Sequence, residues 1–235
     1  MLTRLIITAI TPTIALAIGI YLTDRYDKEP WRLLLRIFLM GALSVIPVVI
    51  VQKLLLSVNI FPDLLFIAYT AFIVAGLTEE FFKRFVIIHG VYNDINFDEK
   101  LDGIVYSVFS ALGFATVENI IYVVFRFSGN YYVGILRGLL SVPAHMLFGI
   151  TMGYYLSLSK YTEEPKLKEY YYRMSLIIPA FLHGLFNFIL MARIPILMIA
   201  FIPYVVYLWV NNLKKLNQYT RASRDKNDRI DDPEE

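Results

Sequence analysis

Apolar runs long enough to cross a bilayer recur along this chain, and only short polar segments separate them. An α-helix needs about 20 predominantly apolar residues to span the hydrocarbon core. The composition agrees, because 57% of the 235 residues are hydrophobic and 18% are charged, whereas a soluble domain carries roughly 25% charged residues. The chain is therefore predicted to be an all-α, polytopic membrane protein, embedded in the lipid bilayer.

About seven transmembrane helices are expected, enclosing an intramembrane site. Their predicted ranges are Leu5–Leu22, Leu33–Leu56, Leu64–Ile88, Leu101–Phe125, Val133–Ser159, Met174–Met191 and Ile196–Val210. Pro47 is expected to kink the second span, and a polar connection is expected from Gln52. Polar loops are predicted at 24–36, 89–100, 126–132 and 160–173. Residues 1–212 would form the membrane domain, and residues 213–235 a charged, disordered cytoplasmic tail.

The distribution of Lys and Arg predicts the orientation of the spans. If loop 24–36 lies inside and the spans alternate, most of the 22 Lys and Arg residues fall on the inner side. This places the N-terminus outside and the C-terminus in the cytoplasm. The first run contains Ala15-Leu16-Ala17, which resembles a signal-peptidase site. We favour an uncleaved span, because the run continues to Leu22 and no soluble domain follows.

Two features of the composition exclude whole classes of function. The chain has no cysteine, which excludes disulfides, thiol catalysis and cysteine-ligated metal. Its net charge is only +2, and its basic residues sit mostly at span ends, so a nucleic-acid partner is not expected.

The third predicted span carries charge that a bilayer tolerates poorly. Glu79 and Glu80 lie in its second half, and Lys83 and Arg84 follow one turn later. A charged group inside a span costs a few kcal/mol even on lenient scales. An ion pair between Glu79 and Lys83 would lower that cost. Alternatively, the glutamates form a solvated boundary, and the two basic side chains extend to the inner surface.

More polar residues lie on the other spans, namely Glu118, Asn119, His145, His183 and Asn187. A lone His or Asn in a span is often only a contact between helices. Glu118 is different, because no cation lies within four positions of it. Its partner must therefore come from another helix.

The depths of these groups can be estimated from a rise of about 1.5 Å per residue. The two histidines fall near the bilayer centre, Glu79 and Glu80 about 5 Å to the inner side, and Glu118 about 7 Å to the outer side, level with Asn187. Untilted helices could not bring all of them together. Helix tilt, or kinks at Pro143 and Pro179, would be needed.

Together these side chains have the chemical properties needed for hydrolysis or for metal binding. Carboxylates can act as general bases toward water, histidines can bind metal or move protons, and Asn187 can donate a hydrogen bond to an oxyanion. Two His and one or two Glu could also bind zinc, yet no H-E-x-x-H motif occurs. If a metal is present, the expected ligands are Glu80, Glu118, His145 and His183.

At these residues the chain resembles PrsW, a family of bacterial polytopic membrane proteases related to the CAAX prenyl proteases and to bacteriocin-processing enzymes. The resemblance covers about residues 20 to 190. It rests on E-E-x-x-K at Glu79–Lys83, F-x-x-x-E-N at Phe114–Asn119, His145, and the sequence HGLFN at His183–Asn187. The CAAX proteases carry a histidine where this chain has Glu118, which favours PrsW over prenyl-protein processing.

The resemblance implies a peptidase of the bacterial plasma membrane that makes the first cut in a single-span anti-sigma factor, leading to release of the sigma factor in envelope stress. The implied catalytic residues are Glu79, Glu80, Glu118, His145, His183 and Asn187. Lys83 and Asn119 would support them. Zinc is one option, but water activated directly by glutamate and histidine is the preferred interpretation.

Two other functions fit the same buried groups. The carboxylates could relay ions or protons in a coupled transporter, although the chain shows no inverted repeat. Alternatively, the protein could be a non-catalytic scaffold that binds other membrane proteins. In that case, Glu→Gln changes would leave its function intact.

Overall fold

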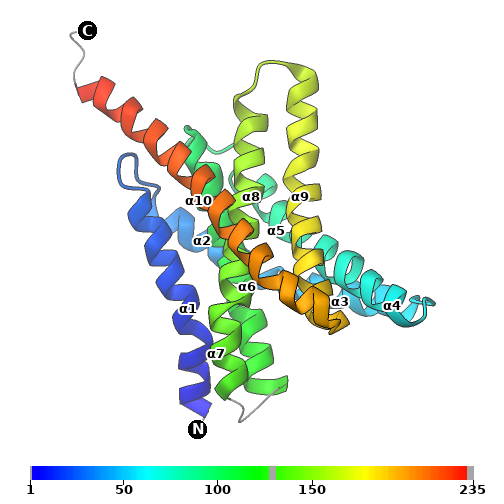
Figure 1. Ribbon diagram of the computed structural model, residues 1–235. Coiled ribbons are helices and arrows are strands. Elements are labelled where there is room, and N and C mark those ends of the chain that lie inside the picture. The colour runs from blue at the N-terminus through cyan, green and yellow to red at the C-terminus, as the bar shows by residue number, and fades with distance from the viewer. Residues whose placement is uncertain (1, 127–130, 232–235) are drawn as a thin grey trace.

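The computed structural model describes residues 2–126 and 131–231, and every regular element in this part of the chain is a helix (Figure 1). The predicted all-α membrane fold is confirmed, since seven helical stretches are long and apolar enough to cross a membrane. These stretches are Leu2–Thr23, Trp31–Ser57, Asp63–Gly90, Lys100–Arg126, Gly134–Tyr161, Pro165–Ala192 and Pro195–Asp228. Most of the loop predicted at 126–132 lies outside the described residues.

Four of the seven stretches are interrupted or wound differently along their length. The second is divided into α2 (Trp31–Leu43) and α3 (Val45–Ser57) at Ser44. Pro47 lies in the first turn of α3 and has no N–H for the Leu43 carbonyl, which explains why the helix breaks just before it. Gln52, expected to begin a connection, lies within α3.

The third and fourth stretches contain wide π-helical turns beside the polar residues. The third consists of α4 (Asp63–Tyr69), the π-helix η1 (Thr70–Leu77) and α5 (Thr78–Gly90), so Glu79 and Glu80 follow directly after η1. The fourth consists of α6 (Lys100–Ile120) and η2 (Ile121–Arg126), which begins three residues after Glu118. Such π-helical turns occur frequently at functional sites.

The fifth stretch also breaks, into α7 (Tyr131–Leu139) and α8 (Ser141–Tyr161). Pro143 is the third residue of α8, as Pro47 is of α3, and the break at Leu140 lies just before it, as expected of a proline that cannot bond the Leu139 carbonyl. Pro179 does lie inside a helix, α9 (Pro165–Ala192). Because α9 already begins at Pro165, much of the loop predicted at 160–173 is helical.

The last helix, α10 (Pro195–Asp231), runs obliquely across the bundle (Figure 1). The expected disorder beyond residue 212 is wrong for residues 213–231, which are helical. This segment has packing partners that its composition did not reveal. Leu216 and Tyr219 are buried, the Tyr219 ring stacks on Tyr154 of α8, and Lys226 pairs with Asp27 and Asp98. Residues 232–235 lie outside the described part.

Helix α6 lies at the centre of the bundle, between α1 (Leu2–Thr23) on one side and α8 on the other (Figure 1). It also packs closely against α2, because a Cβ at Gly113 would collide with the carbonyl of Phe38. Elsewhere in the bundle, a Cβ at Gly184 of α9 would collide with Phe72 of η1. Glycines at these two contacts allow the backbones to approach, as is usual between membrane helices. The oblique α4–η1–α5 stretch thereby lies directly against α9.

Candidate active site

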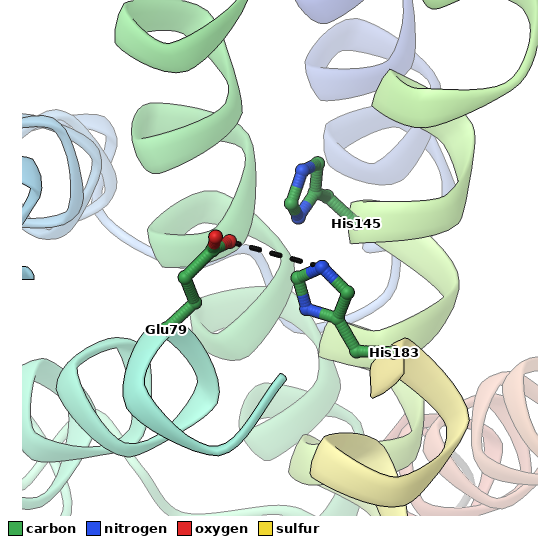
Figure 2. A group of neighbouring side chains, drawn as sticks. All are labelled: Glu79, His145 and His183. Carbon is green, nitrogen blue, oxygen red and sulfur yellow. Dashed lines mark ion pairs between the residues drawn. The ribbon is translucent and has the colours of Figure 1, made fainter. Parts of the chain in front are cut away.

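Three ionisable side chains from three different helices meet inside the bundle (Figure 2). They are Glu79 of α5, His145 of α8 and His183 of α9. One potential ligand atom of each lies within 4.8 Å of the others, and all three residues are buried. Among the described residues this is the one group of His, Asp and Glu side chains that could hold a metal ion.

Glu80 neighbours Glu79 in sequence but makes different contacts. Its Oε1 accepts hydrogen bonds from Lys83 Nζ at 2.7 Å and from His183 Nδ1 at 2.8 Å. Because the Glu80 carboxylate paired with Lys83 only accepts, the hydrogen of His183 resides on Nδ1. The second ring nitrogen, Nε2, then keeps its lone pair and lies 3.8 Å from Glu79 Oε2. A carboxylate that orients a histidine in this way is a common feature of zinc sites.

Lys83 provides the positive charge at the centre of the group. Its side chain is completely buried, and it lies 2.7 Å from Glu80 and 3.6 Å from Glu79. The predicted ion pair with Glu79 is thus present, but the closer partner is Glu80. Lys83 Nζ also lies 2.9 Å from His145 Nδ1. Arg84 points elsewhere and donates to Ser175 and to the carbonyl of Tyr172.

Glu118 joins the same network from α6. Its Oε2 lies 3.0 Å from His145 Nε2 and accepts a 2.8 Å bond from Arg137. Since Lys83 donates to Nδ1 of His145, Nε2 carries the ring hydrogen and donates it to Glu118. A continuous chain of contacts therefore runs from Glu80 through Lys83 and His145 to Glu118. The vertical gap estimated from straight helices is closed, and the α4–η1–α5 stretch crosses α9 obliquely (Figure 1).

Arg137, on α7, is a site residue that sequence reasoning missed. Besides Glu118, it donates from Nε to Asn119 Oδ1 at 3.0 Å, and its guanidinium lies 3.9 Å from the ring centre of Tyr122. Its position in a predicted apolar span was a usable signal, because an arginine there needs a partner. Asn119 in turn donates to the carbonyl of Ala9, and so links α6 to α1.

Gln52 is the second residue that was missed. Its side-chain amide donates a 3.1 Å hydrogen bond to Glu79 Oε1 from the neighbouring helix α3. The sequence predicts that a polar connection begins at this residue, and an amide in such a connection needs no explanation.

Asn187 lies at the opening of the site rather than in its network. A small polar cleft is lined by Glu118, Arg137, His145, His183 and Asn187 together with Ser141, Ala144, Phe148 and Phe186. The Glu118 side chain is 21% exposed, whereas Glu80 is fully buried. Of the predicted catalytic carboxylates, Glu118 is therefore the one that this cleft reaches.

The donor set fits a metal ion. Glu79 Oε2 is buried without a hydrogen-bond partner, and His183 Nε2 is free to act as a ligand. His145 has a contact at each nitrogen and would exchange one of them for the metal. Glu80 and Glu118, expected as ligands, are not part of the group of three, which contains Glu79 instead.

The chain is also similar in sequence to the members of one known protein family. The family model described as "PrsW family intramembrane metalloprotease" matches residues 29–210. The chain is 42% identical to "Protease PrsW" of Clostridioides difficile (strain 630), over 94% of this chain and 93% of that protein. It is 36% identical to "Protease PrsW" of Bacillus subtilis (strain 168), over 90% and 93%. No solved structure matches. The chain is therefore a member of the PrsW family, a membrane-embedded protease.

Proposed function

We propose that this protein hydrolyses a peptide bond in a single-span membrane protein, as the first cut in an anti-sigma factor of the bacterial plasma membrane. The observation that carries the proposal is the buried group of Glu79, His145 and His183, next to a cleft that reaches Glu118. The cut would lead to release of the sigma factor during envelope stress. The N-terminus would lie outside and the C-terminus in the cytoplasm.

We infer that the site works with a bound metal ion, held by Glu79, His145 and His183. The family description as a metalloprotease supports this over the metal-free hydrolysis preferred from the sequence. Two histidines and one carboxylate, leaving further positions open, are a typical ligand set of catalytic zinc. When bound, such an ion polarises a carbonyl group and lowers the pKa of water.

Glu118 is proposed to accept a proton from the attacking water. Both of its hydrogen bonds use Oε2, which leaves Oε1 available to the attacking water. As the water oxygen bonds to the carbonyl carbon, one proton passes to Glu118. The C–N bond then breaks, and the same proton passes to the leaving nitrogen.

Arg137 and Asn187 are proposed to hold the reacting groups from the two sides of the cleft. Arg137 pairs with Glu118 and fixes its position through the contact with Asn119. Asn187 lines the cleft, and its amide can donate to the oxyanion that forms on the substrate carbonyl. Glu80 stays behind His183, where it sets the orientation of that ring, and Lys83 balances the charge of the buried carboxylates.

Reconstitution with a single-span anti-sigma substrate tests the proposal. We expect cleavage by the wild type, its loss on treatment with a zinc chelator, and its recovery when zinc is restored. Glu79→Ala, Glu118→Ala and His183→Ala should each abolish cleavage, while Glu163→Ala in the 162–164 loop should not. Unchanged cleavage in all three site variants would contradict a protease site here.

Reconstitution of the protein into liposomes also distinguishes a protease from a transporter. A coupled carrier would move ions or protons across the membrane without cutting the substrate, and Glu118→Gln would stop that flux. A scaffold would show neither activity.

A further inference from the structure

Gln52 places an amide group in an otherwise mostly apolar helix, one side of which packs into the bundle while the other is exposed. The sequence of α3 is VIPVVIVQKLLLS, and its neighbouring residues Ile50 and Leu54 are 56% and 63% exposed. Gln52 itself is partly buried and directed toward the site. An unpaired amide in lipid costs several kcal/mol (on the order of 4 or more for transfer without a partner). A polar side chain at this position of an apolar helix therefore requires a structural reason.

The hydrogen bond to Glu79 supplies that reason. Gln52 Nε2 donates to Glu79 Oε1 at 3.1 Å. No second side chain hydrogen-bonds to Glu79 in the described ranges, because Lys83, the nearest cation, lies 3.6 Å from Oε2. Lys83 is moreover directed at Glu80 and His145, to which its distances are shorter. Gln52 is therefore the side chain that orients the Glu79 carboxylate.

The two oxygens of Glu79 then have separate roles. Oε1 is held by Gln52, while Oε2 is buried without a hydrogen-bond partner and lies 3.8 Å from His183 Nε2. A matching pair exists on the other ligand, since Glu80 holds Nδ1 of His183 and leaves Nε2 free. In Glu79 and in His183 alike, one side-chain atom is held by a hydrogen bond and the other faces the site.

We propose that Gln52 is a positioning residue that holds Glu79 Oε1 and thereby presents Oε2 to the metal ion. This inference rests on the metal site proposed above. Gln52 acts only through Glu79 and does not touch the substrate. It contributes to metal affinity in the same way as the hydrogen-bonded partners behind zinc ligands, whose loss typically weakens metal binding about 10- to 100-fold.

The test is zinc binding by the purified full-length protein in detergent, measured by competition with a chromophoric chelator. Gln52→Leu removes the donor, keeps a side chain of similar size, and suits the apolar sequence of α3. We expect zinc affinity to fall about 10- to 100-fold. The absorption spectrum of the cobalt-loaded protein should also change, since Glu79 is no longer held. Gln218→Leu, on an exposed position of α10, is the matched control and should leave both readings unchanged.

Thermal unfolding of the metal-free proteins separates a positioning role from a structural one. If Gln52 only stabilised the contact between α3 and α5, Gln52→Leu would unfold at a lower temperature but bind zinc as the wild type does, and the inference would be wrong. Failure of the proposed metal site looks different. In that case the wild type itself binds no zinc, and the inference about Gln52 falls with the site.

Discussion

His183 Nδ1 and Glu80 Oε1 lie 2.8 Å apart, and this contact separates the roles of two adjacent glutamates. Glu80 binds the back of His183 and the ammonium group of Lys83, whereas Glu79 faces the front of the same histidine (Figure 2). Consecutive residues on a helix point about 100° apart, so one can face the reaction site while the other supports it.

Glu80→Gln is predicted to lower the free energy of unfolding far more than Glu79→Gln. Glu80 is the closest counter-charge of Lys83, and both side chains are fully buried. Removing one partner of a buried ion pair costs about 3–5 kcal/mol, because the other charge stays buried without compensation. Glu79 lies 3.6 Å from Lys83, so its loss should cost clearly less. Reversible unfolding of the metal-free proteins in detergent measures both values, and equal losses would contradict the division of roles.

Arg137→Met is predicted to lower kcat about 100-fold, with a much smaller change in KM. The variant removes the charged partner of Glu118 and the fork that also holds Asn119, so the general base is misplaced. Arg137→Lys should recover only part of the activity, since one ammonium group cannot replace two directed donors. Arg173→Met is the control, because Arg173 is exposed and pairs with Glu169 on the same helix. A pure KM effect would instead place Arg137 among the substrate-binding residues.

The spans and the polar site residues could be predicted because their signals are local. An uninterrupted apolar run predicts a membrane helix, and Glu79, Glu80 and Glu118 stand out against it by their charge. Arg137 and Gln52 could not be assigned in the same way. The significance of Arg137 depends on a contact between α7 and α6, and that of Gln52 on a contact between α3 and α5.

The C-terminal segment shows the same limit of sequence-based prediction, because its composition predicts disorder where the structure has a helix. Residues 213–231 are polar and charged, which predicted disorder, yet they form the end of α10. Their stability comes from buried contacts such as Tyr219 on Tyr154 and from the distant ion pairs of Lys226. None of these partners is near in sequence. Composition describes the segment alone, whereas its structure depends on the surface against which it packs.

The stability of the protein is predicted to decrease as pH rises from 5 to 9, because carboxyl groups are buried together between α1, α6 and α10. Burial raises the pKa of Glu29 from 4.5 to about 9, that of Glu99 from 4.5 to about 7, and that of Asp24 from 3.8 to about 6. Facing Glu29 are Tyr106, which donates to it, and Asp102 of α6. Lys226 of α10 is paired with Asp27 and Asp98 at the rim.

The direction follows from proton binding. With raised pKa values the folded protein binds more protons than the unfolded chain, so its stability is greatest at low pH and is lost as these groups ionise. For Glu29 that loss extends from about pH 4.5 to about 9. Glu29→Gln should therefore flatten the decrease in melting temperature between pH 5 and 9, while Glu163→Gln should not. A melting temperature of the wild type that rises over this range would contradict the assignment.

Lys83→Met is predicted to bind zinc more tightly than the wild type, by at least about ten-fold. The ammonium group lies 2.9 Å from His145 Nδ1 and 3.6 Å from Glu79 Oε2, so it contacts two of the three residues that would hold the metal. Two unit charges of the same sign about 4 Å apart repel by roughly 4 kcal/mol at an effective dielectric constant of 20, and this repulsion grows in proportion to each charge. A divalent ion at this site must therefore overcome Lys83. Methionine removes the charge and keeps the length of the side chain.

The comparison with Lys83→Arg isolates the effect of charge. Arginine keeps the positive charge next to Glu79, so zinc affinity should remain at or below that of the wild type. Lys53→Met, at an exposed position of α3, controls for the loss of a lysine elsewhere. Chelator competition gives all four affinities, and metal-free unfolding shows whether Lys83→Met is still folded. Weaker zinc binding by folded Lys83→Met would mean that Lys83 helps to assemble the ligands. In that case its bond to His145 would orient the ring for the metal instead of competing with it.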